Sequence, residues 1–573
     1  MSDIVINWIL FTFSILLGLL PILIERIRYR KENVKDFFRN HIPTFFASLF
    51  LTVGCLTRLC LLDKLPGGLN QDEASAGYDA YSIMTYGFDR NGMKYPVHLI
   101  AWGSGQNAAY SYFAIPFLKL FSNTEIALRL PMALSGCLSL FVFYYVLKTF
   151  QDDFASTSSI FLLVINPWHI MKSRWALESN LFPEMVFLAT LLLLATIRKK
   201  NYLFFYLSAI LFAFSSYSYG TSYFFLFFYI LFFLFYFLFK KIFPWYHLFF
   251  YLMTVAILCI PIMLFLYINL FDKETIHLLW FDIPKLKTDR FHAVTSIFSK
   301  DFFRNGLENW KNNFLLLVTQ NDFLPWNSIP YFGTLYLFTI PFSVLGLFHG
   351  IIRDRKSLLT NDLSPEDRTA SAYLFLIRNW FLVSVMMMFI LNGNINRINV
   401  VWFPLLLSAT LGILDFISFF HELKTRQTII KSTFALSYLA SFLSFSVYYA
   451  TTWNKEHIKP NFYASFKEAL LYSESIEHET TYISSHANYT LVLYYTKYNT
   501  KDYIDTVEIT NPGSAFENVR SFSGYVFSLP RKLERGNTYI VYNQDSPYSD
   551  EILSSYQVTR FQYYSVIDTT VGI

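Results

Sequence analysis

Residues 221–240 read TSYFFLFFYILFFLFYFLFK, a run in which the only charged side chain is the lysine at its end. A helix of about 20 such residues is long enough to cross the hydrocarbon core of a bilayer. Comparable apolar runs recur near 5–24, 42–62, 127–148, 154–171, 178–197, 202–219, 246–269, 334–352, 372–391, 398–419 and 432–451. The sequence therefore predicts a polytopic α-helical membrane protein with about 12 transmembrane helices.

The composition agrees with this class. Of 573 residues, 54% are hydrophobic and only 15% are charged, against about 25% charged residues in a soluble domain. The net charge of +5 is spread over short loops, which indicates membrane topology rather than nucleic-acid binding. The four cysteines lie in apolar segments without metal-ligand spacing, and we interpret them as buried small hydrophobes: Cys55, Cys60, Cys137 and Cys259.

The orientation follows from short basic loops, because positive charge marks the cytoplasmic face. All of these loops fall on the same predicted side: 25–41, 198–200, 240–241, 353–356 and 424–426. Both termini are then predicted outside the cytoplasm. The three long polar segments, 63–126, 271–333 and 452–573, are predicted on that outer side as well, and the first two are expected to hold short interfacial helices.

We divide the chain into three parts. Residues 1–41 hold the first span and its basic cytoplasmic loop, and residues 42–451 form a transmembrane domain with outer loops 63–126 and 271–333. After Thr452 the apolar runs shorten to strand length, with a helix-like stretch at 462–476. The predicted strands are Thr481–Ile483, Gly524–Phe527 and Thr538–Tyr542. This pattern predicts a small extracytoplasmic α/β domain at 452–573.

Two adjacent carboxylates, Asp72 and Glu73, stand in the first outer loop, where residues 66–75 read PGGLNQDEAS. Carboxylates at the edge of a bilayer are costly to desolvate, which favours a function. A pair of acids suits general-base chemistry, because one can ionise while the other positions or tunes it. The pair by itself is equally consistent with a solvated loop.

Four arginines lie at the ends of spans on the predicted outer side: Arg58, Arg129, Arg174 and Arg397. A single arginine at a membrane edge usually extends to the lipid headgroups. Four of them on the side of the carboxylates point to a shared anionic ligand. A guanidinium binds phosphate oxygens in a bidentate way, so a lipid phosphate fits this set.

Short motifs then follow one another in a fixed order: NQDE at 70–73, GFDRNG at 87–92, YP at 95–96, LFS at 120–122, ALRLP at 127–131, NPWH at 166–169 and SR at 173–174. Arg397 stands seven residues before Pro404. In this order the motifs resemble the GT-C membrane glycosyltransferases. The most similar branch is the protein O-mannosyltransferase and aminoarabinose transferase superfamily, particularly its bacterial members. The resemblance covers residues 42–450, and the tail resembles the variable outer domain of many members.

The resemblance implies an inverting transfer of one sugar from a polyprenyl-phosphate donor to an extracytoplasmic acceptor at the plasma membrane. Asp72 matches the catalytic carboxylate of the family, acting as general base, and Glu73 supports it in the catalytic pair. Arg397 is the first choice and Arg174 the second for the lipid phosphate. Arg58 and Arg129 either join this phosphate site or hold loop structure.

Two further residues are placed in the substrate site. Asp89, in the GFDRNG motif, is expected to contact substrate. His169 either helps to hold the acceptor or forms an interfacial aromatic pair with Trp168. Apart from the donor lipid we expect no cofactor, and no spacing predicts a metal site, although a divalent metal is left open.

The chain also departs from the family. Aminoarabinose transferases carry a Lys-Pro-Pro-type element in this loop, and protein mannosyltransferases carry His-Pro-Pro. Residues 104–110 read SGQNAAY instead, without lysine. The sugar therefore stays open, and so does the acceptor, which is a protein, a wall polymer or a glycolipid.

Two other functions compete with this one. A lipid-linked sugar flippase or transporter predicts inverted repeats and charges near the bilayer midplane, whereas the conspicuous charges here stand at span ends. A sugar-polymer ligase would share the lipid donor without needing Asp72.

Overall fold

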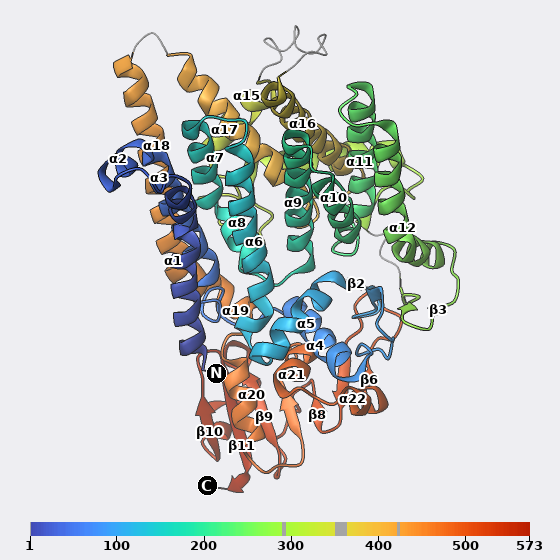
Figure 1. Cartoon of the computed structure of the whole chain (residues 1–573). Helices are drawn as coiled ribbons and strands as arrows, with labels where there is room; N and C mark the ends of the chain where they lie inside the picture. The colour runs from blue at the N-terminus through green and yellow to red at the C-terminus, as the bar shows by residue number, and fades with distance from the viewer. Residues whose placement is uncertain (1, 289–293, 350–363, 421–423, 573) are drawn as a thin grey trace. The chain divides into compact units, whose positions relative to one another are not determined.

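The computed structural model describes residues 2–288, 294–349, 364–420 and 424–572 (Figure 1). Within these residues, nine helices are long and apolar enough to cross a membrane. They are α1 (Asp3–Arg28), α3 (Ile42–Leu59), α6 (Glu125–Leu147), α9 (Glu178–Lys199), α11 (Ser222–Phe239), α12 (Trp245–Leu270), α16 (Pro365–Ile390), η2 with α17 (Asn399–Val401 and Trp402–Ser418), and the continuous run of α18 (Lys424–Tyr448), η3 (Tyr449–Ile458) and α19 (Lys459–Asn461).

The remaining predicted spans are shorter or broken. Helices α7 (Asp153–Val164) and α8 (Pro167–Ser173) form one apolar run bent by 58°. The bend falls at Asn166, whose side chain accepts the His169 N–H at 2.9 Å and so starts a new helix. Helices α10 (Tyr202–Ser215) and η1–α15 (Leu337–Leu347) are apolar but short. The predicted fold class, a polytopic helical membrane protein with a C-terminal α/β part, is confirmed.

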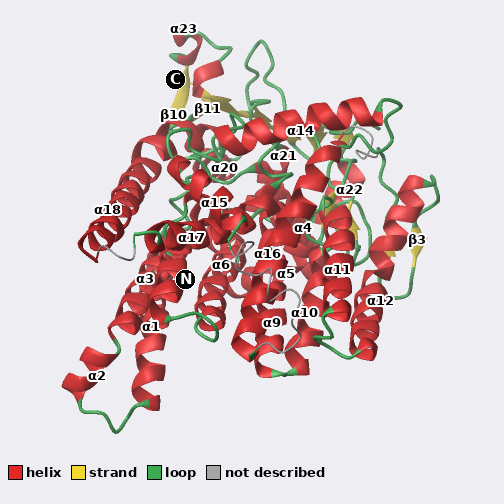
Figure 2. Cartoon of the chain, turned by 90° about the horizontal axis from the view of Figure 1, so that it is seen from above, coloured by secondary structure: helices red, strands yellow, loops and turns green. Residues whose placement is uncertain are grey.

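The chain divides into two compact units. Unit 1 comprises Met1–Leu61, Met132–Ile260 and Phe291–Tyr449. Within it, α15 (Ile340–Leu347) and α17 lie side by side (Figures 1 and 2). A Cβ atom at Gly346 or Gly412 would overlap the backbone of the facing helix. Glycine is needed at both positions because close backbone approach is the main source of helix–helix attraction in lipid.

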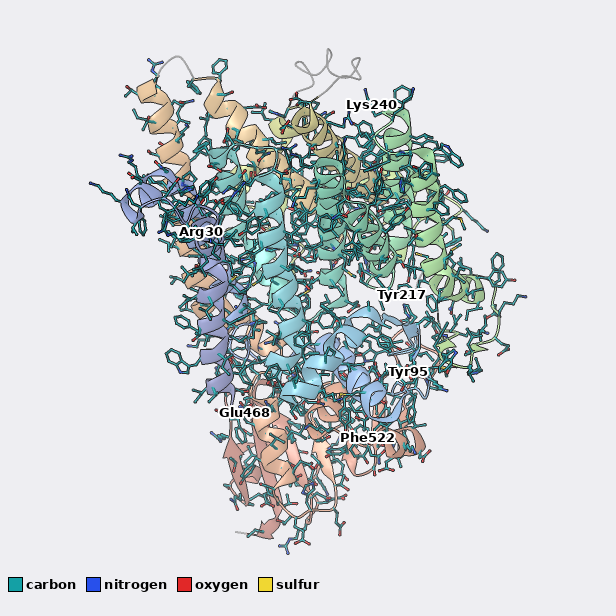
Figure 3. The ribbon with its side chains drawn as sticks, viewed as in Figure 1. Arg30, Tyr95, Tyr217, Lys240, Glu468 and Phe522 are labelled. Atoms are coloured by element: carbon teal, nitrogen blue, oxygen red, sulfur yellow. The ribbon has the colours of Figure 1, made fainter. Side chains whose placement is uncertain are left out.

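Basic turns of unit 1 stand at one end of its helices. Figure 3 labels Arg30, after α1, and Lys240, after α11, and both lie at the upper ends of these helices. Helix α2 (Val34–Asn40) follows Arg30 in the same basic loop. The predicted basic loop 353–356 lies outside the described residues.

The segment 271–333 contains a helix with two distinct faces, α14 (Phe302–Thr319). On one face, Asn313 donates from Nδ2 to the backbone oxygens of Met388 and Leu391 at 3.0 and 2.8 Å, which fixes α14 on the end of α16. On the other face, Phe303 is 75% exposed. An exposed apolar face of this kind is typical of a helix lying at a membrane surface.

Unit 2 comprises Leu62–Pro131, Pro261–Arg290 and Ala450–Ile573. Its centre is a seven-stranded sheet of order β10-β11-β9-β5-β8-β7-β6, in which β5 pairs in parallel with β9 and β8 while the other pairs are antiparallel. The strands are β5 (Thr481–Ile483), β6 (Glu508–Ile509), β7 (Val519–Phe522), β8 (Tyr525–Val526), β9 (Thr538–Tyr542), β10 (Tyr556–Arg560) and β11 (Tyr564–Gly572). The interior strand β9 is buried along its whole length, in agreement with its largely apolar sequence, TYIVY.

Helices and short strand pairs complete unit 2. The helices are α4 (Gln71–Tyr86), α5 (Ala109–Phe121), α20 (Phe466–Glu474), α21 (Tyr489–Thr496), α22 (Thr500–Thr506) and α23 (Asp550–Leu553), with the 3-10 turn η4 (Asn543–Asp545). The strand pairs are β1 (His98–Leu99) with β2 (Gln106–Asn107) and β3 (Ile276–His277) with β4 (Asp282–Ile283). Phe522, labelled in Figure 3, lies 5.2 Å from the Tyr503 ring of α22 and 5.3 Å from Tyr525 of β8. Unit 2 thus joins the first outer loop and the tail.

Candidate functional site

Asp72 stands in the first turn of α4, and the start of this helix is built by its own sequence. Asn70 is the N-cap, and its Oδ1 accepts the Asp72 N–H at 2.9 Å. In return Glu73 Oε2 accepts the Asn70 N–H at 3.0 Å, which completes a capping box. The side chain of Asp72 is half-buried, whereas that of Glu73 has no exposed surface. The two neighbouring carboxylates therefore face different environments.

Glu73 forms a bidentate ion pair with Arg129. The guanidinium donates from Nε and Nη2 to the two carboxylate oxygens, both at 2.8 Å. Its other N–H groups donate to the backbone oxygens of Leu62, Pro66 and Gly68 at 2.8, 2.7 and 2.6 Å. All five N–H donors of this arginine are thus used inside the loop. Arg129 holds loop structure here, which was one of the two roles considered for it, and its predicted phosphate contact stays a prediction.

The tail fastens the start of α4. The Leu69 N–H donates to the Phe462 backbone oxygen at 2.7 Å, and Thr490 Oγ1 donates to the Gln71 backbone oxygen at 3.3 Å. Tyr463 donates its hydroxyl to Gln71 Oε1 at 3.1 Å. Burial, followed by the charge of Asp72, raises the pKa of Tyr463 to about 12, so the hydroxyl remains a donor at neutral pH. Residues distant in sequence thus set the position of the Asp72 turn.

Asp89, the second predicted acid of this loop, is completely buried. Its Oδ1 accepts the N–H groups of Asn91 and Met93, both at 2.9 Å, and these bonds close a turn. Burial, and next to it the charge of Asp79, raise the pKa of Asp89 to about 7. These contacts are those of a loop-forming residue, and the expected contact of Asp89 with substrate stays a prediction.

Arg90, which the sequence reasoning did not single out, begins a chain of hydrogen bonds that reaches the Asp72 turn. The Arg90 guanidinium donates from Nη2 to Ser75 Oγ at 2.8 Å. Ser75 donates to Gln106 Oε1 at 2.8 Å, and Gln106 Nε2 donates to the Asp72 backbone oxygen at 3.4 Å. Gln106 stands in the segment where the resembled families carry lysine or histidine. Here its amide supports the helix that carries the acid.

Arg58 and His169, two predicted site residues of unit 1, lie together in a buried polar chain. Arg58 Nε donates to His169 Nδ1 at 3.0 Å, and its Nη2 donates to the Leu163 backbone oxygen at 3.1 Å. Because a guanidinium only donates, the imidazole proton must sit on Nε2, which lies 2.8 Å from Glu184 Oε1. Both side chains are completely buried. They hold helices α3, α8 and α9 together, and their predicted contacts with substrate stay predictions.

Arg174 covers the end of α3. It donates from Nη1 to the Thr57 backbone oxygen at 2.7 Å and from Nη2 to those of Cys60 and Leu61 at 2.7 and 3.0 Å. The last carbonyls of a helix lack intrahelical partners, so a cation is favourable at this position. Arg174, the second choice for the phosphate, is 2% exposed and engaged in this cap.

Arg397 differs from the other three arginines. Its side chain is half-buried, and among the described residues its guanidinium has no hydrogen-bond or ion-pair partner. Its backbone is nevertheless held, because its N–H donates to the Asn394 backbone oxygen at 3.1 Å. Two residues before Arg397, the Ile395 N–H donates to Asp322 Oδ2 at 3.0 Å. A fixed backbone with an unengaged guanidinium is suited to binding an anion.

Lys172, in α8, is a further cation that the sequence reasoning did not select. It is 3% exposed, and its Nζ donates to the side-chain oxygens of Asn327 and Asn396, both at 2.8 Å. The ammonium also lies 4.6 Å from the centre of the Trp175 ring. Asn396 directly precedes Arg397, so this buried lysine fixes the loop that carries the unengaged arginine. A lysine inside an otherwise buried helix is the signal that could have found it.

No metal-binding cluster is found in the part of the chain that the structure describes: no three histidine, cysteine, aspartate or glutamate side chains gather in a suitable group. Among the described polar residues, a carboxylate such as that of Asp72 can accept a proton, and a guanidinium such as that of Arg397 can bind an anion.

Comparison with known proteins gives a fold. No protein-family model and no curated protein sequence matches the chain. Among solved structures, ArnT from Cupriavidus metallidurans, an aminoarabinose transferase, is similar in its apo state, with 12% identity over 91% of this chain and 98% of that one and a TM-score of 0.50. ArnT bound to undecaprenyl phosphate gives the same identity and coverage, with a TM-score of 0.51.

A second group of solved structures is also similar. The archaeal oligosaccharyltransferase AglB from Archaeoglobus fulgidus matches with 12% identity over 78% of this chain and 62% of that one, at a TM-score of 0.43. The match to ArnT covers nearly the whole length of both chains. The fold expected from the sequence motifs is confirmed: this chain has the fold of the GT-C membrane glycosyltransferases.

Proposed function

We propose that this protein transfers a sugar from a polyprenyl-phosphate donor to a hydroxyl-bearing acceptor on the extracytoplasmic face of the plasma membrane. The observation that carries the proposal is the contrast at the start of α4. There Arg129 binds both carboxylate oxygens of the buried Glu73, while Asp72 remains half-buried in the first turn. Support comes from the fold, which the chain shares with ArnT, a protein solved with undecaprenyl phosphate bound.

In the proposed reaction, Asp72 is the general base. Its carboxylate takes the proton of the acceptor hydroxyl as that oxygen attacks the anomeric carbon of the sugar. The bond between this carbon and the phosphate oxygen breaks, and the lipid phosphate leaves with the electron pair. Attack opposite the leaving group inverts the anomeric configuration. The capping box and the tail contacts position the carboxylate before the substrates arrive, which lowers the entropic part of the barrier.

Arg397 is proposed to bind the lipid phosphate. Its unengaged guanidinium can donate two parallel hydrogen bonds to phosphate oxygens, and the charge that develops on the leaving group strengthens them. Lys172 acts through Asn396 as a positioning residue for the Arg397 loop.

The proposal is tested with purified protein in proteoliposomes that contain undecaprenyl-phosphate sugars labelled in the sugar. A panel of donors, each made with a different nucleotide sugar, identifies the one consumed. We expect wild-type protein to release undecaprenyl phosphate and to place the label in a new glycosidic bond with inverted configuration. The variant Asp72→Asn should not do so.

The matched control is Asp502→Asn, because Asp502 is an exposed aspartate in the first turn of another helix of unit 2, α22. This variant should transfer sugar like the wild type. Full transfer by Asp72→Asn would overturn the mechanism. Movement of the labelled lipid between leaflets without a new glycosidic bond would identify a flippase instead.

A further inference from the structure

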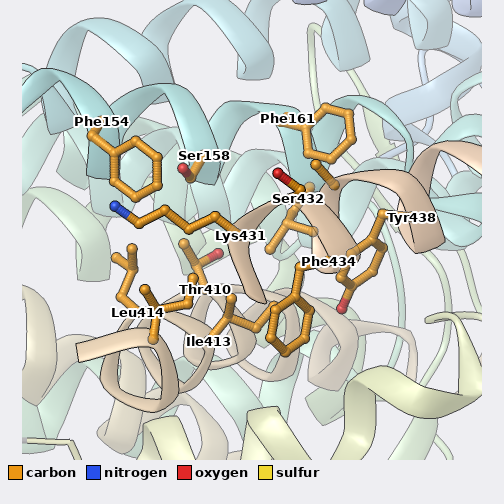
Figure 4. Close-up of a pocket in the computed structure, with 13 residues that line it drawn as sticks. Phe154, Ser158, Phe161, Thr410, Ile413, Leu414, Lys431, Ser432, Phe434 and Tyr438 are labelled. Carbon is orange, nitrogen blue, oxygen red and sulfur yellow. The ribbon is translucent and has the colours of Figure 1, made fainter. Parts of the chain in front are cut away.

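A cavity of about 310 Å³ lies within unit 1 between α7, α17 and α18 (Figure 4). Its wall is almost entirely apolar and includes Phe154 and Phe161 of α7, Ile413 and Leu414 of α17, and Phe434 of α18. This volume is at the lower end of the range for ligand pockets in proteins, about 300–1,000 Å³. None of the residues proposed for sugar transfer lines it. The cavity therefore needs an explanation of its own.

The position of the cavity along the helices is informative. Phe154 belongs to the first turn of α7, and Leu414 to the last turns of α17, which ends at Ser418. Helix α18 begins at Lys424, in the basic loop predicted on the cytoplasmic side. Lys431 stands seven residues farther on, which corresponds to about 10 Å along a helix axis. The cavity thus opens near the predicted cytoplasmic boundary between headgroups and hydrocarbon.

Lys431 is the only charged residue among those that line the cavity in the described structure. Its side chain extends along the cavity toward Phe154, as Figure 4 shows, and Nζ lies 4.4 Å from the centre of the phenyl ring. Within the described residues, this ammonium has no hydrogen-bond or ion-pair partner. A lysine with an apolar wall on one side and an uncompensated charge matches an amphiphile with an anionic head.

We propose that this cavity binds one acyl chain of an anionic phospholipid from the cytoplasmic leaflet, with the lipid phosphate at Lys431. The apolar wall accounts for the acyl chain, and the hydroxyl groups of Ser158 and Ser432 add polar atoms to the lining. The uncompensated ammonium accounts for the preference for a negative headgroup. The proposal does not depend on the proposed sugar transfer, because a phospholipid here would stabilise the packing of three helices and take no part in the reaction.

The test uses the full-length protein in nanodiscs with a phosphatidylglycerol that carries a photoreactive diazirine in its acyl chain. Cross-linked peptides are identified by mass spectrometry, and we expect them on α7, α17 and α18. The same probe built on phosphatidylcholine measures the contribution of the headgroup. Lys431→Ala should lower the cross-linking of phosphatidylglycerol about fivefold, the factor expected for one basic side chain at an anionic surface, while leaving that of phosphatidylcholine unchanged.

Two further variants make the result decisive. Ala435→Phe places a ring in the cavity and should lower cross-linking of both lipids, because Ala435 lines it. Lys199→Ala, which removes an exposed lysine at the end of α9, should change neither. Equal labelling of phosphatidylglycerol in wild type and Lys431→Ala would overturn the proposal. So would displacement of the probe by an equimolar amount of undecaprenyl phosphate, which would identify a polyprenyl lipid as the occupant.

Discussion

The turn that carries Asp72 and the loop that carries Arg397 share one arrangement, in which a charged residue stands beside a residue that is held in place. In each, one residue of an adjacent polar pair is locked in place, and the charged side chain of the other is half-buried. Glu73 is locked by Arg129, and Asn396 is locked by Lys172. The locked neighbour fixes the backbone on which the charged side chain beside it stands.

The two regions differ in the elements that hold the charged residue. Asp72 stands in the first turn of a 16-residue helix that the tail holds by several hydrogen bonds. Arg397 stands in a loop before the three-residue turn η2, and its longer side chain has more freedom. A positioned carboxylate suits proton transfer, which demands accurate geometry. A flexible guanidinium suits binding of a phosphate whose place shifts as the sugar leaves. Substitutions in the two regions test this difference.

Asp72→Asn should have the largest effect. Removing a positioned general base typically lowers kcat by about 10²–10⁴-fold. The thermal unfolding temperature should stay at the wild-type value, because the Asn70 and Glu73 contacts that build the turn are kept. The measurement is single-turnover sugar transfer together with thermal unfolding in detergent. An unfolding temperature below that of the wild type would show that Asp72, like Glu73, stabilises the fold.

Arg129→Met should act on stability. It leaves the buried Glu73 carboxylate without its partner, and breaking a buried ion pair in this way costs about 3–5 kcal/mol. We expect a large decrease in the unfolding temperature and in the yield of folded protein. The double variant with Glu73→Gln should recover part of the loss, because no unpaired charge remains. If Arg129→Met were as stable as the wild type and defective only in donor binding, Arg129 would be the phosphate ligand.

Arg397→Ala should weaken binding of the donor. Loss of charge-assisted hydrogen bonds corresponds to about 1.5–3 kcal/mol, so the KM for the polyprenyl-phosphate sugar should rise about tenfold or more. Stability should be unchanged, since no described contact of the guanidinium is lost. Arg174→Ala is the matched comparison and should lower the unfolding temperature. An unchanged donor KM in Arg397→Ala would assign this arginine to lipid headgroups.

Lys172→Met should have a similar but smaller effect on the donor. Methionine fills the space of the lysine, while Asn396 loses the ammonium that fixes it. We expect a several-fold increase in donor KM, together with faster hydrogen exchange at the Arg397 loop. Lys172→Arg, which keeps a charge, should restore part of the exchange protection. If hydrogen exchange at the Arg397 loop were unaltered in Lys172→Met, the lysine would not be what holds this loop in position.

The smallest expected effect concerns Asp89 and pH. Its folded-state pKa is raised from 3.8 to about 7, so between these values the folded chain binds more protons than the unfolded chain. Stability contributed by this group therefore falls as pH rises from about 4 to 7. Asp89→Asn keeps the oxygen that accepts the turn N–H groups and removes the titration. Its unfolding temperature should change less between pH 5 and 7.5 than that of the wild type. If Asp89→Asn kept the pH dependence of the wild type, the pH-dependent stability would come from Asp79 and not from Asp89.

Much of the fold could be predicted, because apolar span length and strand composition are local properties. The strands Thr481–Ile483 and Thr538–Tyr542 were placed at their observed bounds. Residues 154–171 were predicted as one span, yet the chain bends there by 58° at Asn166. Asn166, a favourable N-cap residue, and the proline after it are visible in the sequence. The apolar run on both sides of them, however, predicts one uninterrupted span.

The candidate site was predicted less completely. Asp72 and Arg397 were chosen from their motifs, and both have half-buried side chains in the structure. The family resemblance ranked Arg397 first and Arg174 second, whereas position alone does not separate Arg397 from Arg58, Arg129 and Arg174, since all four occupy span ends. Lys172 and Arg90 were passed over because their importance lies in hydrogen bonds to distant residues.

The sequence by itself determined that the chain spans a membrane, where its helices lie and that a carboxylate pair opens the first outer loop. These features depend on hydrophobicity and on capping residues that are close in sequence. Only the tertiary structure decided which charged side chains form ion pairs inside the fold, as Glu73 and Arg129 do, and which do not, as is true of the Arg397 guanidinium among the described residues. Arg129 is consumed because carbonyls more than sixty residues away in the chain converge on it. Hydrogen-bond partners are set by proximity in space, and local sequence carries little information about them.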